Sequence, residues 1–217
     1  MRILLLTLVI LLCGCATTPR LDEIVIGPDH EVKNVHKTWP QLPQDIKRVA
    51  VMPLTGSPTQ PQTAQGREYF DEALRVELDK LGRAEMAHLT REQVKLWSGR
   101  ESWRADEVLP STLVTKVASE MDAQAILFVH LASYHAYPPL TIGWRMRLVR
   151  ADTRETLWAL DEVFDAGQEP VANSARRFAK NRAPTTPSLA DSRTALISPS
   201  LFARYTLCAS LATIPAR

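Results

Sequence analysis

Apolar residues recur in two different patterns in the first half of the chain. Residues 49–52 form an unbroken apolar run that ends at a proline, a pattern typical of a strand buried on both faces. Residues 67–81 instead place apolar side chains three and four positions apart, which predicts an amphipathic helix ending at a glycine. A short strand is predicted over residues 85–89. The chain therefore enters a folded domain with a strand, a helix and a strand.

The second half contains a longer run of strands. Residues 125–131 are apolar almost throughout and predict another strand buried on both faces. Residues 141–149 alternate instead, so that Arg145 and Arg147 fall on one face and the apolar residues on the other. This alternation predicts an antiparallel strand with only one face covered. Residues 156–163 are its predicted hairpin partner, joined through the turn "RADTRE".

Helices are expected between and after these strands. Residues 111–121 form an amphipathic pattern, residues 171–182 predict a basic helix, and residues 198–212 predict a last amphipathic helix. Residues 95–109, which hold two tryptophans, have no regular period, although "TREQ" just before them resembles a capped helical turn.

The predicted order of elements in the core is β-α-β-α-β-β-β. This order favours an α/β fold, in which a mixed β-sheet has helices packed mainly on one face. A C-terminal helical extension is expected from about residue 168.

The N-terminus has the pattern of an export signal. One arginine precedes the apolar run of residues 3–12, which is too short to span a bilayer as a helix because spanning takes about 20 residues. The next residues, Leu12, Cys13, Gly14 and Cys15, resemble the lipobox of bacterial lipoproteins. Cleavage before Cys15 would remove Cys13 with the signal, so this pattern predicts lipidation of Cys15. The alternatives are an ordinary cleaved signal and a structural pair of cysteines.

This prediction divides the chain into three parts. Residues 1–14 are the expected lipoprotein signal peptide, residues 15–45 the lipidated N-terminus and a polar tether, and residues 46–217 a single α/β periplasmic domain. Acyl chains on Cys15 would attach the protein to a membrane without any requirement on the fold. Ala16 follows the cysteine, where aspartate would signal inner-membrane retention, so the expected address is the outer membrane.

Composition and charge exclude several classes of protein. The 217 residues are 45% hydrophobic and 23% charged, which is typical of a globular domain. The formal charge is only +2, from 26 basic and 24 acidic residues, so no overall field favours nucleic acid. No nucleic-acid partner is predicted.

Four stretches carry a resemblance to a known group. They are "KRVAVMPL", "LDKLG", "VASEMDAQAILFVHL" and "RMRLVRADTRETLWA", within residues 47–165. Their order resembles that of periplasmic lipoproteins related to the curli-secretion lipoprotein (CsgG-like), the LpoB-type activators of penicillin-binding proteins and the N-terminal domain of TolB. The sequence departs from that pattern at Arg154, where the turn usually has glycine. The resemblance implies a binding or assembly module on a lipid anchor, without catalysis.

Motifs for cofactors and common catalytic sites are not found. The eight glycines stand singly, so no phosphate-binding loop or nucleophile elbow occurs, and no cofactor is predicted. His30 and His36 are six residues apart and would face opposite sides of a helix, which argues against a metal site. His130 and His135 are expected to be hydrogen-bonded side chains at a strand end.

Acidic residues gather after the last strand, with Asp161, Glu162 and Asp165 followed by Glu169. Paired carboxylates can perform acid–base catalysis, although charges that discourage edge pairing of the sheet explain the cluster better. Cys208 is the remaining thiol after the signal region and is expected to be buried as a small apolar residue on the last helix.

Two surfaces are candidates for partner binding. The loop "SYHAYPPL" presents Tyr134, His135 and Tyr137, and rigid aromatic loops make good anchors, although close packing of a strand crossover is the alternative. The basic helix carries a cluster that could contact anionic lipid or an acidic partner, although a solvated helix face explains it as well. The residues of this cluster are Arg176, Arg177 and Lys180.

The sequence thus predicts a lipid-anchored envelope protein that binds a protein partner as an accessory or assembly factor and is not an enzyme. Two alternatives stay open. One is an oligomeric scaffold associated with secretion, and the other is a hydrolase of envelope polymer that uses Asp161, Glu162 and Asp165.

Overall fold

The structure is a computed structural model that describes residues 26–57, 59–182 and 193–217. A single sheet of seven strands runs through it in the order β1-β7-β6-β5-β2-β4, with the short β3 beside β5. β2 is parallel to β4 and to β5, whereas the pairs β5–β6, β6–β7 and β7–β1 are antiparallel. The strands are β1 (Val35–Lys37), β2 (Arg48–Val51), β3 (Thr55–Gly56), β4 (Glu85–His88), β5 (Ala125–His135), β6 (Thr141–Arg150) and β7 (Thr156–Asp165).

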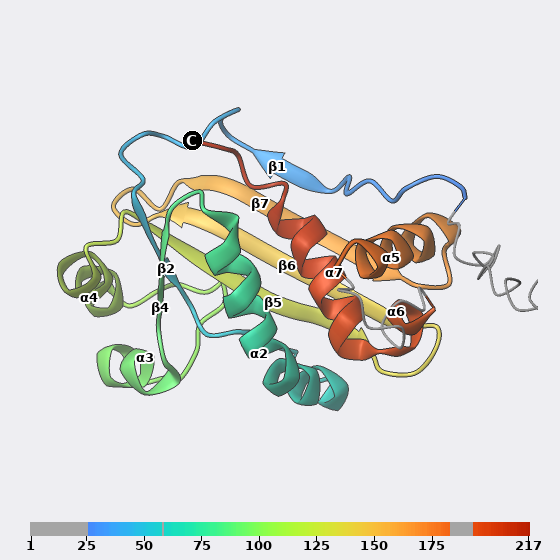
Figure 1. Ribbon diagram of the computed structural model, residues 1–217. Coiled ribbons are helices and arrows are strands. Elements are labelled where there is room, and N and C mark those ends of the chain that lie inside the picture. Colours follow the sequence, from blue (N-terminus) through green and yellow to red (C-terminus); the bar gives the residue numbers. More distant parts are fainter. Residues whose placement is uncertain (1–25, 58, 183–192) are drawn as a thin grey trace, which may run out of the picture.

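Helices cover the two faces of this sheet unequally (Figure 1). The longest, α2, lies on β5, α7 lies on β6 and β7, and α5 lies on β7, so that these helices form a layer on one face. α3 and α4 pack at the end of the sheet where β2 and β4 lie. The helices are α2 (Pro61–Leu81), α3 (Arg91–Ser98), α4 (Ser111–Met121), α5 (Glu169–Arg182), α6 (Thr194–Ile197) and α7 (Pro199–Leu211). Among the described residues, no helix is both long and apolar enough to cross a bilayer.

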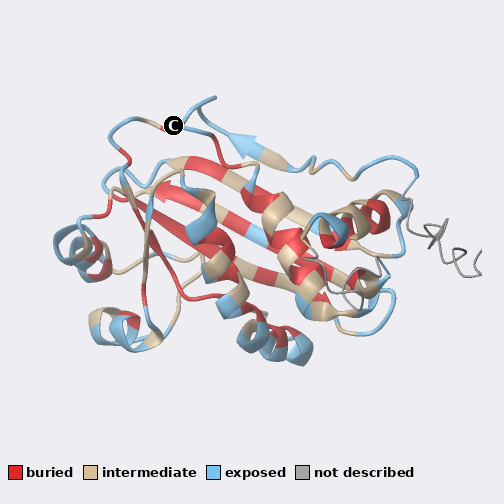
Figure 2. Ribbon diagram, viewed as in Figure 1, coloured by how far each residue is buried: buried red, intermediate tan, exposed pale blue. Residues whose placement is uncertain are grey.

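The main core lies between the sheet and the layer formed by α2, α5 and α7. Trp144 and Trp158 are completely buried there, and each indole donates a hydrogen bond to a threonine of the C-terminal region. Buried indoles need such an acceptor, because an unpaired N–H in an apolar core costs about 1–3 kcal/mol. Figure 2 shows this buried layer as a red band along the strands and the inner sides of the helices.

A smaller apolar cluster holds α3 and α4 against the opposite face. Val94 of α3 and Val117 of α4 pack on Ala50, Ile126 and Phe128 of the sheet. These helices pack on the part of the face formed by β4, β2, the beginning of β5 and the end of β6 at Val149. The rest of β6, together with β7 and β1, has no helix over it in the described chain.

The predicted fold class is confirmed. The structure has a mixed sheet with helices mainly on one face, and its core elements follow the predicted order. α2 begins at Pro61, earlier than predicted, because proline is favoured in the first turn of a helix and its absent N–H is not needed there. The segment predicted as irregular begins inside a true helix, since Thr90 and Gln93 form a complete capping box for α3.

The turn between β6 and β7 explains the departure noted at Arg154. This residue has a φ of 60°, in the left-handed region where glycine is favoured. A side chain therefore stands where the backbone conformation costs about 1 kcal/mol or more.

Much of the predicted tether lies against the domain. Residues 26–45 run along the free edge of β7, where β1 pairs with Leu160, Ala159 and Trp158. Further on, Leu42 is buried and its N–H donates to the carbonyl of Ala216. We call residues 26–45 the strap. Sequence patterns did not predict its pairing with β7, because pairing along a sheet edge is set by backbone hydrogen bonds and needs no apolar period. The predicted signal peptide and lipobox, including Cys15, lie outside the described residues.

Candidate functional site

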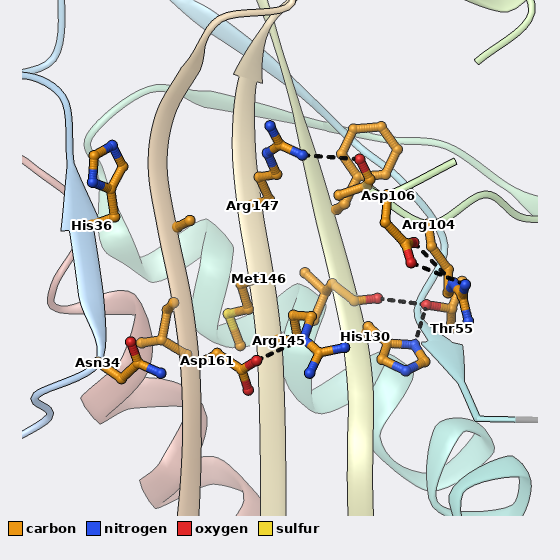
Figure 3. A pocket seen from close by; sticks show the side chains of 15 residues that line it. Asn34, His36, Thr55, Arg104, Asp106, His130, Arg145, Met146, Arg147 and Asp161 are labelled. Atoms are coloured by element: carbon orange, nitrogen blue, oxygen red, sulfur yellow. Dashed lines mark hydrogen bonds and ion pairs between the residues drawn. The ribbon is translucent and has the colours of Figure 1, made fainter. Parts of the chain in front are cut away.

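A cleft lies on the face of the sheet that α2, α5 and α7 do not cover. Alternate residues of a strand point to opposite faces, so Arg145 and Arg147 point away from the core that buries Trp144 and Met146. The cleft has a volume of about 260 Å³ and extends over β1, β7, β6 and β5 to the loop after α3 (Figure 3).

One row of polar side chains crosses this face from strand to strand. Thr55 of β3 pairs with His130 of β5, His130 with Arg145 of β6, and Arg145 with Asp161 of β7. Directly opposed residues of neighbouring strands have their side chains on the same face and within contact distance. The register of the sheet therefore builds a continuous polar row from residues distant in sequence.

A second row runs beside it and forms the middle of the cleft. Phe128 pairs with Arg147, Arg147 with Ala159, and Ala159 with His36 of the strap. The methyl side chain of Ala159 leaves space between the longer side chains on either side. The cleft at this row thus has an apolar base and a guanidinium at its side.

Two of the arginines around the cleft are neutralised locally. The Nε of Arg145 donates to Asp161 Oδ2 at 2.8 Å, and Arg104 forms an ion pair with Asp106 at 3.0 Å. Both pairs are drawn as dashed contacts in Figure 3. These arginines therefore bring little net charge to the cleft.

Arg147 is held differently. Its Nε and one terminal nitrogen donate to Thr156 Oγ1 at 2.8 and 2.6 Å, and the other terminal nitrogen donates to the carbonyl of Ala105 at 3.2 Å. All of these acceptors are neutral, and no carboxylate of the described residues forms an ion pair with this half-buried guanidinium. Arg147 is thus fixed in position while its charge is not compensated.

His130 contributes a neutral ring to the same site. Its pKa is lowered from the usual 6.5 mainly by burial; Arg104 and Arg145 lower it further, and their partners Asp106 and Asp161 offset part of that effect. The Thr55 hydroxyl donates to the carbonyl of Val129 and lies 2.9 Å from His130 Nδ1.

The acidic residues proposed for a hydrolase do not converge. Asp161 faces the cleft and is paired with Arg145, whereas Glu162 lies on the helix side and contacts His30 at 3.3 Å. Glu162 also accepts the backbone N–H groups of the strap at Lys33 and Asn34. Adjacent residues of a strand cannot act on one substrate from one side of the sheet.

The other two carboxylates of that group have local positions. Asp165 accepts the N–H of Gly167 at 2.8 Å and closes the turn after β7, and Glu169 begins α5. The structure therefore separates a cluster that looked continuous in the sequence.

The aromatic loop is only partly exposed. Tyr134 was a candidate for partner binding, with close packing as the alternative, and the structure shows close packing: it is 7% exposed and packs edge-on against Phe70 of α2. The reason is that β5 continues to His135 and has a β-bulge between Leu131 and Ser133, which shifts the alternation and turns Tyr134 to the core side. His135 and Tyr137 do lie at the surface, with Tyr137 72% exposed.

The basic helix contacts the N-terminal segment. Arg177 forms an ion pair with Asp29 and also donates to the carbonyl of Gly27. Arg176 is half-buried and Lys180 is exposed, on the same helix. Part of the basic cluster thus holds the segment that leads to the domain.

The remaining candidate residues are separated in space. His30 contacts Glu162 and Phe164, whereas His36 contacts Thr38 on the strap. Within the ranges that the structure describes, no three or more histidine, cysteine or acidic side chains are grouped so as to hold a metal ion. Cys208 is half-buried on α7, and burial raises the pKa of its thiol.

The cleft itself was not predicted from the sequence. Alternation in residues 141–149 placed Arg145 and Arg147 on an uncovered face, which was the available signal. Their neighbours in the cleft come from β1, β5, β7 and the loop after α3 through long-range pairing. A local period carries no information about such pairing.

Comparison with known proteins gives similar shapes at low identity. No family model and no curated protein matches the chain. A PelC dodecamer structure from Paraburkholderia phytofirmans is 12% identical, with a TM-score of 0.47, over 84% of this chain and 98% of that one. Lipoprotein GNA1162 from Neisseria meningitidis is 14% identical, with a TM-score of 0.39, over 56% and 85%.

An LpoB C-terminal domain from Escherichia coli is 16% identical, with a TM-score of 0.36, over 54% of this chain and 82% of that one. The LpoB-type group named from the sequence is thus among the similar solved structures. At these identities and scores the likeness assigns no function to the chain.

Proposed function

We propose that this chain is a lipid-anchored protein of the bacterial envelope whose α/β domain binds a protein partner and performs no catalysis. The lipobox of residues 12–15 supports the anchor, and Cys15 is the proposed lipid attachment. The observation that carries partner binding is the uncovered sheet face, where Arg147 is fixed in a cleft with its charge uncompensated.

The arrangement of carboxylates argues for binding over hydrolysis. General acid–base hydrolysis needs two carboxyl groups directed at the same bond, about 5–10 Å apart in glycosidases. Asp161 and Glu162 lie on opposite faces of the sheet, and Asp161 is already paired with Arg145. The Asp161→Asn variant of a hydrolase would lose activity, whereas an accessory protein would retain its effect in cells.

The membrane anchor is tested by metabolic labelling of cells with palmitate. The wild-type chain should take up label and the Cys15→Ser variant should not. An unlabelled wild type would exclude the anchor and leave an ordinary cleaved signal peptide as the alternative.

Partner binding is tested by cross-linking the full anchored chain in its native cells and identifying what it captures. The expected result is reproducible capture of an envelope protein other than this chain. Capture of this chain alone, together with a large particle in sedimentation of the detergent-solubilised protein, would favour the oligomeric scaffold instead.

A further inference from the structure

We infer that the cleft accepts an acidic side chain, aspartate or glutamate, from the protein partner, and that Arg147 binds its carboxylate. This inference rests on the proposed function and names the chemistry that the partner must present. Three features of the described residues support it: the charge of the cleft, the free donors of Arg147, and the size and lining of the space.

The first feature is the charge. Arg104 and Arg145 each have an aspartate as partner, and Arg147 has none among the described residues. His130 adds no charge at neutral pH because its pKa is lowered by burial and by the neighbouring arginines. The cleft therefore has one uncompensated positive charge, which matches a single carboxylate better than a polyanion such as nucleic acid.

The second feature is the set of donors. A guanidinium has five N–H groups, and Arg147 uses three of them toward Thr156 and Ala105 in the described chain. Two N–H groups on the terminal nitrogens are left. Arginine binds carboxylates through two parallel N–H groups, and hydrogen bonds to a charged acceptor are roughly twice as strong as neutral ones.

Fixing the guanidinium through Thr156 and Ala105 also lowers the entropy that binding would cost. An arginine side chain that is free to rotate loses up to about 2 kcal/mol of conformational free energy when it is immobilised. Arg147 is immobilised already in the unbound fold, which favours recognition of a partner group at this position.

The third feature is the space. At about 260 Å³, the cleft is smaller than the roughly 300–1,000 Å³ of sites that enclose a drug-sized small molecule. It is large enough for one inserted side chain. A second hollow of about 230 Å³ shares Phe128, Ala105 and Arg147 with the first and is lined by Val108, which is 86% exposed.

The two hollows place apolar surface on both sides of Arg147, and the second is also lined by Arg154 and by Glu107, which is paired with Arg100. A partner segment in which an acidic residue stands beside an apolar one would fill both of them. Interface anchors of this kind, an arginine beside buried apolar area, dominate the binding energy of many complexes.

The test uses photo-cross-linking of the full anchored chain in its native cells. A photoreactive amino acid replaces His36 or, separately, Val108, because both are exposed and lie on opposite sides of Arg147. The same substitution at Tyr137, on the loop between β5 and β6, reports partner binding elsewhere on the surface. Each position is examined with Arg147, with Arg147→Lys and with Arg147→Gln.

The inference predicts that one partner cross-links at His36 and Val108, and that the captured partner peptide contains aspartate or glutamate. Arg147→Gln should lower the yield by at least about fivefold, because a charge-assisted pair is lost. Arg147→Lys should retain an intermediate yield, since it keeps the charge without the planar fork. The matched control is the double variant Arg145→Gln/Asp161→Asn, which removes a paired positive and negative charge from the same face without changing the net charge of the cleft, and it should change the yield less than about twofold.

Two different failures are distinguishable. An unchanged yield in folded Arg147→Gln, or a partner captured at Tyr137 and not at His36 or Val108, would overturn the inference while leaving partner binding intact. Capture of no partner at any of the three positions would overturn the proposed function and the inference together. The unfolding midpoint of each variant, measured in parallel, identifies any loss of yield that comes from misfolding.

Discussion

The two faces of β6 differ in what their side chains contact. Toward α2 and α7, Trp144 and Met146 are completely or almost completely buried. Toward the other side, Arg145 and Arg147 contact Asp161, Thr156 and a loop carbonyl. The same ten residues thus supply the centre of the core and the middle of the cleft, which shows that one strand can be assigned two roles by alternation alone.

The two faces also differ in whether their charged side chains have ion-pair partners. On the helix side, Glu77 is 5% exposed and forms ion pairs with Arg182, Arg204 and Lys80, so a buried charge is fully compensated between α2, α5 and α7. On the open side, Arg147 is fixed by neutral acceptors. Compensation fits a structural role, and a charge left uncompensated fits the binding of an external group.

The largest effect is expected on the covered face. Trp144→Ala removes a completely buried indole and its hydrogen bond to Thr206, so the free energy of unfolding should fall by about 3–5 kcal/mol. The neighbouring Arg145→Ala, on the open face, should change it by about 0.5 kcal/mol or less. Urea denaturation measures both, and equal losses would contradict the distinction between the faces.

The buried ion pairs of Glu77 should give the next largest effect. Glu77→Gln leaves the charges of Arg182 and Arg204 without their partner and should cost about 1–3 kcal/mol. Glu72→Gln is the matched control, because Glu72 lies on the same helix and pairs with Arg75 at the surface. That exposed pair should be worth about 0–1 kcal/mol. A loss at Glu72 as large as that at Glu77 would show that burial does not set the difference.

The pH dependence of stability should separate the faces further. For Glu77, burial raises the pKa, but hydrogen bonds from Arg182 and Arg204 and the charges of Arg182 and Lys80 outweigh it and hold the pKa below the usual 4.5. The stabilisation is therefore present above about pH 4.5 and is lost as the pH falls through the lowered value. Urea denaturation should show the difference between wild type and Glu77→Gln shrinking in this acid range, and a constant difference would be inconsistent with a lowered pKa.

A smaller effect in a different pH window is expected from His130. Its pKa in the folded chain is lowered below 6.5 by burial and by Arg104 and Arg145, so the unfolded chain binds the proton first as the pH falls. Wild type should lose stability relative to His130→Gln as the pH decreases from about 6.5. Denaturation curves at about pH 7.5 and pH 5.5 measure this change. A relative gain of stability for wild type at the lower pH would mean that the folded chain favours protonated His130.

The sequence contained much of the fold and little of the site. The apolar runs and the alternation around Arg145 and Arg147 predicted the core strands, because a period of two is a local property of the chain. The same local reasoning placed Tyr134 in a loop after the strand, although β5 extends far enough to bury it. The cleft depends on which strands are neighbours. The pairing of Arg147 with Ala159, and of Ala159 with His36, cannot be predicted from the sequence of any one segment.

Glu77, in the helix layer on the opposite face of the sheet, also could not be assigned its role from local sequence. In the sequence it is one polar residue of an amphipathic helix, and nothing near it indicates burial. Two of its three partners, Arg182 and Arg204, are on α5 and α7, more than one hundred residues further along the chain. Long-range charge compensation could therefore be recognised only in the folded structure.

The central claim is that the partner contacts the open face of the sheet and not the helix layer. The most direct measurement places one photoreactive amino acid either at His36, beside the cleft, or at Tyr69, which is 66% exposed on α2. In native cells, with the full anchored chain, the partner should be captured at His36 at least about fivefold more efficiently than at Tyr69. The reason is that a photoreactive side chain reacts only with groups in contact with it, and Tyr69 lies on the helix layer, away from the open face. Equal capture at both positions, or capture at Tyr69 alone, would contradict the claim.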